Sequence, residues 1–304
     1  MQNSNVIDDT YEKIKTMQVR GAMDIAMAAA GALEEFVKKA RGNTTEITAH
    51  LASAGEKLKK ARPTAISLPN SVDYVLSEAE ANRHMGAAKF KKTMASKIED
   101  FITKQEKAIA HIAEIGAEII EDGDTILTHC NSDTVMEILK KAHFDGKKIS
   151  VVCTESRPRN QGHISARELS THGLPVTLIV DSAVHLMMKE LKVDKVFVGA
   201  DTIYANGDVV NKIGTSQVAI CAHAMEIPFF VAAQSIKFSS ESLFGKYVEI
   251  EERDPAEVTT ISKVKIRNPA FDVTPAYNIT AIITERGAIP PESAYQFLYR
   301  AGQI

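Results

Sequence analysis

The second part of the sequence alternates short β-rich runs with helical stretches, and this pattern constrains the fold more than any other feature. Five runs follow Gly123 and end at turn signals: TILTHC, KISVVCTES, PVTLIVDS, KVFVGAD and PFFVAAQS. Helical stretches precede or separate these runs, and NITAIITERG is a sixth candidate strand with a helix after it. Because strands that alternate with helices pair in parallel, we expect an α/β domain whose mostly parallel sheet is covered on both faces.

The part of the chain before Gly123 predicts helices only. The stretch YEKIKTMQVRGAMDIAMAAAGALEEFVKKA has apolar residues at helical spacing, and TTEITAHLASAGEKLKKA predicts a second helix capped by Thr44 or Thr45. The two prolines of RPTAISLPNSV predict a loop before a third helix that starts near Ser71. We therefore expect a helical domain with a linker helix over residues 1–122 and a second domain over 123–304.

Composition and short motifs exclude several classes of protein. The 304 residues are 25% charged with a net charge of −3, which is typical of a soluble globular protein and argues against a nucleic-acid partner. We expect no membrane association, because no apolar run is long enough to span a bilayer and the start lacks the order of a signal peptide. Three widely spaced cysteines suit the cytoplasm. The chain has no CxxC, HExxH or GxGxxG, so we expect no metal and no cofactor.

Polar side chains follow each of the five predicted strands. Open parallel sheets bind ligands at the carboxyl ends of their strands, near a switch in strand order. We therefore expect one crevice rimmed by five side chains: Cys130, Glu155, Asp181, Asp201 and Gln234.

The position of Cys130 in the sequence allows two interpretations of its role. Free cysteine is commonly a buried apolar residue, and this reading suits Cys153, which continues a strand, and Cys221, which lies on a helical stretch. Cys130 instead ends its strand and precedes a helix, where the helix N-terminus and nearby cations lower the pKa of a thiol. Its position alone leaves a packed and a reactive thiol equally acceptable.

A second group of candidate residues lies in GADTIYANGDVVNKIGT. Asp201 directly follows an apolar strand, so we expect deep burial, a raised pKa and the role of a general acid; the alternative is a turn cap. Asn211 and Lys212 follow at a candidate helix entrance, where an amide, an ammonium group and backbone N–H groups suit an anionic ligand.

Several cations stand in predicted loops, although each one alone is better explained as a surface charge. They are Arg20, Arg62, Arg157, Arg159 and Lys237. Together with Lys212 they suggest phosphate recognition, since arginine binds phosphate through a bidentate fork. In the absence of hydrolase, Walker or kinase motifs, the residues favour acid–base chemistry on a phosphorylated small molecule.

At these residues the sequence resembles a known superfamily. It unites methylthioribose-1-phosphate isomerase, archaeal ribose-1,5-bisphosphate isomerase, and the alpha, beta and delta regulatory subunits of the exchange factor of eukaryotic translation initiation. The resemblance spans nearly the whole chain through the following stretches: RGA at 20–22, RPTA at 62–65, THCNSDT at 128–134, ESRPRNQG at 155–162, GADTIYANGDVVNKIGT at 199–215 and NPAFDVTP at 268–275.

The resemblance implies an N-terminal helical domain, a Rossmann-like second domain and an active site between them. The catalytic cysteine and aspartate of the family fall on Cys130 and Asp201, a pair that the regulatory subunits generally lack. The family's substrate contacts fall on Arg20, Gly21, Ala22, Met23, Arg62, Arg157, Gln161, Asn211, Lys212 and Lys237.

The residues after RGA favour the archaeal bisphosphate enzymes, because MDIAMAAAGAL replaces the Pro-Ala-Ile-Gly run of methylthioribose-phosphate isomerases. The resemblance then implies conversion of ribose 1,5-bisphosphate to ribulose 1,5-bisphosphate in an AMP-degradation route that feeds Rubisco. It also implies AMP as an activator and a homo-oligomer, either a dimer or a hexamer. The alternatives are methylthioribose-1-phosphate isomerase of methionine salvage and a non-catalytic translation-factor subunit.

The expected mechanism is proton transfer. Asp201 protonates the ring oxygen, while Cys130 as thiolate removes the proton from C2 to give a cis-phosphoenolate. The reversed roles, or a hydride shift from C2 to C1, stay open.

Overall fold

The computed structural model describes residues 4–19, 21–62 and 65–301. The chain forms two compact units, Met1–Lys107 and Ala108–Ile304, and each unit is described by itself. No helix of the described residues is long and apolar enough to cross a membrane. The division of the chain at 122/123 stays a prediction.

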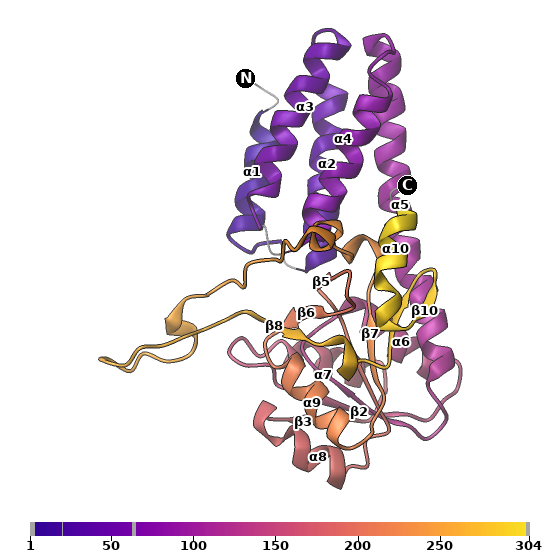
Figure 1. The fold of residues 1–304 in the computed structure, drawn as a ribbon, viewed down its shortest axis with the longest axis vertical. Helices are drawn as coiled ribbons and strands as arrows, with labels where there is room; N and C mark the ends of the chain where they lie inside the picture. Colours follow the sequence, from indigo (N-terminus) through magenta and orange to yellow (C-terminus); the bar gives the residue numbers. More distant parts are fainter. Residues whose placement is uncertain (1–3, 20, 63–64, 302–304) are drawn as a thin grey trace. The chain divides into compact units, whose positions relative to one another are not determined.

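The described residues of the first unit form helices and the turns that join them (Figure 1). Its helices are α1 (Ser4–Lys15), α2 (Ala22–Lys39), α3 (Thr44–Lys59), α4 (Ser67–Ala81) and the first part of α5 (Ala87–Ile119). Helix α2 packs against α1, α3 and α4. It does so through small residues such as Ala26, Ala29 and Ala30, which are fully buried and allow close approach of the helices.

Two details of this unit differ from the sequence prediction. Helix α3 is capped by Asn43, whose side chain accepts from the N–H of Glu46 while the Glu46 carboxylate accepts from the N–H of Asn43. This reciprocal capping box replaces the predicted threonine cap. Helix α4 begins at Ser67, so Pro69 lies in its first turn, where the missing N–H has no intrahelical partner to lose.

The second unit contains a seven-stranded sheet in the order β10-β9-β7-β4-β1-β2-β3. The strands are β1 (Thr125–Thr128), β2 (Ser150–Thr154), β3 (Val176–Ile179), β4 (Lys195–Val198), β7 (Phe229–Ala232), β9 (Ala281–Thr284) and β10 (Gly287–Ile289). All neighbouring strands pair in parallel except β9 and β10. This confirms the predicted α/β class.

Helices cover both faces of this sheet because side chains alternate along each strand. The helices of this unit are α6 (Asp133–Phe144), α7 (Gly162–Thr171), α8 (Val184–Glu190), α9 (Thr215–Ala224) and α10 (Ala294–Ala301). Ile126 and Val151 pack with residues of α5, α6 and α7. Their neighbours Leu127 and Val152 belong to the opposite core, with residues of α8, α9 and α10.

A small antiparallel sheet adds to this unit and was not predicted. It consists of β5 (Thr202–Ile203), β6 (Val209–Lys212) and β8 (Phe271–Thr274) in the order β5-β6-β8. Its register places Asn211 opposite Asp272 and Lys212 opposite Phe271. Asn211 and Lys212 therefore lie at the end of a strand, just before the turn that leads into α9.

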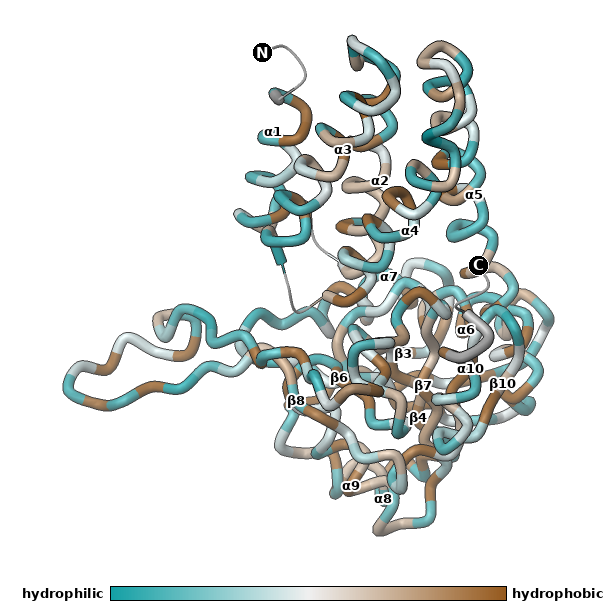
Figure 2. The backbone as a smooth tube through the Cα atoms, turned by 45° about the horizontal axis from the view of Figure 1, so that its top comes forward, coloured by the Kyte–Doolittle hydropathy of each residue, from teal (hydrophilic) through white to brown (hydrophobic). Residues whose placement is uncertain are grey.

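Residues 251–270 form an extended excursion before β8, which we call the arm. Figure 2 shows it running out from the strands of the second unit and returning. Its base is closed by backbone bonds, with the N–H of Arg253 donating to the carbonyl of Asn268 at 2.9 Å and the N–H of Ala270 donating to the carbonyl of Glu251 at 2.8 Å. It contains one short turn, η4 (Pro255–Glu257).

Candidate active site

The switch in strand order lies between β1 and β4, because the chain proceeds from β1 outward through β2 and β3 before it returns to β4 on the other side. Cys130 follows β1 and Asp201 follows β4, so these two residues end the strands that flank the switch. Parallel sheets bind ligands at this place. The strand order therefore brings the two predicted catalytic residues to one edge of the sheet.

Cys130 is half-buried in a strained turn with φ of 69°. A positive φ is uncommon for a residue with a side chain and must be imposed by its surroundings. The N–H of Cys130 lies 2.7 Å from Ser156 Oγ, and its carbonyl accepts from Ser165 Oγ at 2.9 Å. Ser156 directly follows β2 and Ser165 lies on α7, so the end of the neighbouring strand and the helix after it hold the turn of Cys130 in place.

Burial raises the pKa of the Cys130 thiol to about 11. The nearby Lys212 ammonium and a backbone N–H lower the pKa, whereas Asp201 and Asp181 raise it further. The expected depression of the thiol pKa is therefore absent, because burial outweighs the effect of Lys212. The expectation of a buried thiol holds for Cys153, while Cys221 is only partly buried.

His129 ties the end of β1 to the turn between β6 and α9. Its Nε2 lies 2.8 Å from the carbonyl oxygen of Ile213 and its Nδ1 lies 2.6 Å from Thr154 Oγ1. Because a carbonyl only accepts, Nε2 carries the proton and Nδ1 accepts from the threonine in the neutral ring. Burial of the ring lowers the pKa of His129 and favours this neutral form. His129 thus positions the turn and has no free nitrogen for proton transfer.

Asp181 organises the strand ends on the other side of Cys130. Its two carboxylate oxygens accept from the N–H of Ser156 at 2.8 Å and from the N–H of Arg157 at 2.7 Å. Asp181 Oδ1 also lies 3.9 Å from His129 Nδ1. Asp181 therefore links the segments that follow β1, β2 and β3. Glu155, which was predicted to rim the same crevice, is half-buried directly after β2.

Asp201 is half-buried, which differs from the expected deep burial. Its N–H donates to the carbonyl of Val210 at 2.9 Å, because the chain turns at this point into the small sheet rather than into a helix. Two residues earlier, a side-chain carbon at Gly199 would lie 2.6 Å from Ser132 Oγ. This close approach packs the turn after Cys130 against the strand end that carries Asp201.

Lys212 and Asn211 are held by the small sheet and the start of α9. Lys212 Nζ lies 4.5 Å from the centre of the Phe271 ring, a cation–π contact. Asn211 Nδ2 donates to Thr215 Oγ1 at 3.0 Å, and this hydroxyl donates to the Lys212 carbonyl at 2.6 Å. Both residues are thereby fixed beside the α9 N-terminus.

Asp272 belongs to the same constellation, and sequence reasoning assigned it no role. It accepts from the N–H of Gly214 at 2.7 Å and from the N–H of Ser216 at 3.2 Å. Burial raises the pKa of Asp272 to about 6, against the opposing effects of these two N–H groups and of Lys212. The carboxylate orders the turn that carries Lys212.

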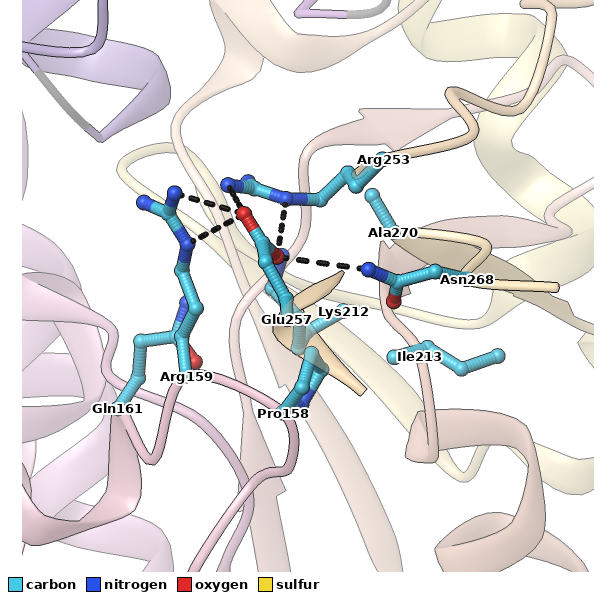
Figure 3. Close-up of a pocket in the computed structure, with 9 residues that line it drawn as sticks. All are labelled: Pro158, Arg159, Gln161, Lys212, Ile213, Arg253, Glu257, Asn268 and Ala270. Atoms are coloured by element: carbon cyan, nitrogen blue, oxygen red, sulfur yellow. Dashed lines mark hydrogen bonds and ion pairs between the residues drawn. The ribbon is translucent and has the colours of Figure 1, made fainter. Parts of the chain in front are cut away.

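A small, open pocket lies beside Lys212 (Figure 3). It is lined by Pro158, Arg159, Gln161, Lys212, Ile213, Arg253, Glu257, Asn268 and Ala270. The pocket brings together Gln161 and Lys212, two predicted substrate contacts, with three charged residues that the resemblance did not assign. The third predicted contact of this region, Arg157, directs Nη2 to the carbonyl of Val258 at 3.2 Å.

The end of β7 carries Gln234 and Lys237. Val198 of β4 pairs with Val231 of β7, so Asp201 and Gln234 each lie three residues beyond a paired valine. Gln234 is 0% exposed, and neither atom of its amide finds a partner among the residues that the structure describes. Lys237 is buried in the short turn η2 (Ser235–Lys237).

The remaining predicted substrate contacts fall in the first unit. One of them, Arg20, lies outside the described residues. Gly21, with φ of 61°, immediately precedes α2, and Ala22 and Met23 form its first turn. Arg62 follows α3. Among the described residues no group of three His, Cys, Asp or Glu side chains suits a metal ion.

The sequence model of the initiation factor 2 subunit family matches residues 18–291. The chain belongs to this family. Ribose 1,5-bisphosphate isomerase of Methanocaldococcus jannaschii is 48% identical over 303 residues, which cover 98% of this chain and 96% of that protein. The enzyme of the same name from Archaeoglobus fulgidus is 49% identical over 293 residues, covering 94% and 90%.

Solved structures related to the initiation factor 2 subunit family share the fold. The crystal structure of 5-methylthioribose 1-phosphate isomerase from Pyrococcus horikoshii OT3 has a TM-score of 0.80 and 34% identity, and the match covers 98% of this chain and 87% of that chain. These matches confirm the family resemblance that the motifs indicated. They also confirm the predicted fold, in which N-terminal helices precede a mostly parallel sheet.

Proposed function

We propose that this protein is an aldose–ketose isomerase that converts α-D-ribose 1,5-bisphosphate into D-ribulose 1,5-bisphosphate. One observation carries the proposal: Cys130 and Asp201 end the two strands that flank the switch point. They do so in a chain that is 48% identical, over nearly its full length, to a relative named for this activity.

The proposed reaction moves one hydrogen from C2 to C1 and opens the sugar ring. Asp201 gives a proton to the ring oxygen as the C1–O bond breaks, and that oxygen becomes the hydroxyl on C4. Cys130 removes the proton from C2 as the C1=C2 double bond forms, which leaves a neutral cis enol that keeps the phosphate on C1 and the hydroxyl on C2. The enol hydroxyl then returns its proton to Asp201 as the C2 carbonyl forms, and the Cys130 thiol protonates C1. Each positioned proton transfer contributes roughly 10²–10⁴ in rate.

The supporting geometry lies around this pair. Lys212 and Asn211 are fixed beside the α9 N-terminus, and Gln161 shares a pocket with Lys212. Cations and N–H groups of this kind bind phosphate and sugar oxygens. The substrate contacts proposed in the first unit are Gly21, Ala22, Met23 and Arg62, with Arg20 from outside the described residues. The contacts proposed in the second unit are completed by Arg157 and Lys237.

The test is turnover of ribose 1,5-bisphosphate by the wild type and by Cys130→Ser and Asp201→Asn. We expect each substitution to lower kcat by at least about 10²-fold, because each removes one of the two proton carriers. Cys221→Ser, which alters a partly buried thiol on α9, is the matched control and should keep full activity. Near-normal activity of either site variant would overturn the assignment.

The same assay separates the proposed substrate from 5-methylthioribose 1-phosphate. That sugar carries one phosphate and an apolar methylthio group, whereas the pocket beside Lys212 is lined by Arg159, Arg253 and Glu257. We expect a kcat/KM at least tenfold higher for the bisphosphate, a difference of about 1.4 kcal/mol. A preference for the methylthio sugar would assign the chain to the sister isomerase, and no turnover of either sugar would favour a non-catalytic subunit.

The finer parts of the proposal rest on the family resemblance. They are a place in AMP degradation that supplies Rubisco, activation by AMP, a cytoplasmic location and assembly into a dimer or hexamer. Turnover measured with and without AMP tests the activation, and light scattering during size-exclusion chromatography tests the assembly.

A further inference from the structure

The arm contributes a carboxylate to the pocket beside Lys212, between two guanidinium groups (Figure 3). Glu257 Oε1 accepts from Arg159 Nη2 at 2.7 Å and from Arg253 Nη2 at 2.9 Å. Glu257 Oε2 accepts from Arg253 Nε at 3.0 Å and from Asn268 Nδ2 at 3.4 Å. Every donor group around this carboxylate is also a donor that suits phosphate oxygens.

The pocket carries an excess of positive charge even with Glu257 in place. Arg159, Arg253 and Lys212 supply three cations against one carboxylate among the lining residues. Arg253 is a fixed part of the wall, because its side chain is only 7% exposed at the closed base of the arm. Its guanidinium, followed by that of Arg159, lowers the pKa of Glu257 to about 2, so the carboxylate is an anion at every physiological pH.

Gln161 lines the same pocket. Its Oε1 is buried without a hydrogen-bond partner among the described residues, so it faces away from a ligand. The pocket therefore offers donors that suit the oxygens of an anion, supplied by its two arginines, Lys212 and Asn268.

We propose that Arg159 and Arg253 form a second phosphate subsite beside Lys212, and that Glu257 occupies this subsite as an internal substitute until a substrate phosphate displaces it. The inference rests on the proposed function and deepens it, because it names what selects a sugar bisphosphate over a monophosphate. A phosphate dianion carries more charge than a carboxylate and presents more acceptor oxygens to the two guanidinium forks.

Glu257 lies on the turn η4, whose other residues are exposed. Around it, Asp254, Pro255 and Ala256 are exposed, so releasing the η4 turn uncovers little apolar surface. The backbone bonds that close the base of the arm are made by Arg253 itself and by Glu251, both outside η4, so they remain when η4 shifts. Displacement of Glu257 therefore leaves Arg253 in place to bind the incoming phosphate.

Glu257→Gln tests the competition directly. The variant keeps the size of the side chain and removes the charge that competes with phosphate. In the Cys130→Ser background, which prevents turnover, we expect the Kd of inorganic phosphate measured by calorimetry to fall about threefold to tenfold. Glu249→Gln is the matched control, because it removes the same charge from an exposed residue outside the pocket. A purely structural clamp predicts the opposite, namely unchanged or weaker phosphate binding together with a lower Tm, and either result would overturn the proposal.

Arg159→Gln tests the subsite itself. We expect the Kd of phosphate and the KM for ribose 1,5-bisphosphate to rise about tenfold, because a bidentate cation is lost. Arg267→Gln removes an exposed, ion-paired arginine of the same arm outside the pocket and should change neither constant. Equal effects of the two substitutions would contradict the proposal.

The phosphate titration needs no turnover, so it tests the subsite independently of the proposed reaction. If the wild type were inactive but these binding changes were observed, the proposed reaction would be refuted and the phosphate subsite would still be supported.

Discussion

At the scale of single residues, burial determines the charge state of Cys130. Burial holds its pKa near 11, and Lys212 offsets only part of this effect. His129, its neighbour in the chain, uses both ring nitrogens to hold Thr154 and Ile213, so it cannot take the thiol proton without breaking those bonds. A thiolate that acts as base must therefore arise from a small ionised fraction.

This charge state predicts the pH dependence of turnover. If the thiolate of Cys130 is the base, its population rises about tenfold per pH unit below the thiol pKa, and kcat/KM should rise with it. The measurement is kcat/KM from pH 7.5 to 9, where the substrate phosphates are already fully charged. The reversed roles, with the thiol as acid, predict a flat profile that falls at high pH, so a profile without a rise would contradict the assignment of Cys130 as base.

Sequence reasoning found some of these residues and missed others for physical reasons. Cys130 and Asp201 follow predicted strands, where topology gathers polar side chains whatever the details of the fold, and Lys212 was placed at a predicted helix entrance. Arg253 and Glu257 carry no such signal, because their role depends on contact with Arg159, about a hundred positions earlier in the chain. Pairing of this kind becomes visible only once the chain is folded.

At the scale of elements, the turn between β6 and α9 is the most constrained connection around the site. Gly214 has a φ of 101°, and a side-chain carbon there would lie 2.9 Å from Cε1 and 3.0 Å from Nε2 of His129. The N–H of Gly214 also donates to Asp272. The turn thus brings α9, β8 and the end of β1 together, and it fixes the backbone of Lys212.

Gly214→Ala should therefore destabilise the fold more than backbone strain alone explains. We expect a loss of about 2–4 kcal/mol in the free energy of unfolding, measured by urea titration with circular dichroism. Gly146→Ala is the matched control, since Gly146 has a φ of 90° and no atom within 4 Å of an added carbon. It should cost only about 1 kcal/mol. If both variants lost the same free energy of unfolding, the contact with His129 would make no contribution to the effect.

The elements themselves were predictable to different degrees. The alternating pattern gave the central strands and the helices that cover them, because apolar periodicity reports burial directly. The small sheet was missed, since β5 has only two residues and pairs with β6 through a turn inside a stretch that reads as a loop. Its third strand, β8, joins from about sixty positions later in the chain.

At the scale of the whole molecule, the arm stands apart from the two helix-covered faces of the sheet. Ile261 and Val264 are more than half exposed on it, and Phe244 and Tyr247 are exposed in the segment that precedes it. Exposed apolar side chains in this number favour contact with another protein surface.

Limited proteolysis reports whether the arm is covered in solution. Lys263 and Lys265 are exposed near its middle, so we expect trypsin to cut there first and to leave a long N-terminal and a short C-terminal fragment. Mass spectrometry identifies the site, and a Lys263→Gln, Lys265→Gln double variant should resist cleavage. A wild-type arm that resists trypsin would contradict its exposure, and light scattering would then show whether assembly protects it.

The protonated state of Cys130 also bears on the survival of the protein under oxidative stress. Peroxide and alkylating agents attack the thiolate, and a thiol with a raised pKa presents very little of it. Over-oxidation of a catalytic cysteine to sulfinic acid is in general irreversible. Burial keeps the Cys130 thiol protonated, and it therefore protects the resting protein from irreversible oxidation at this residue. Oxidants should react with Cys130 only while the thiolate is formed.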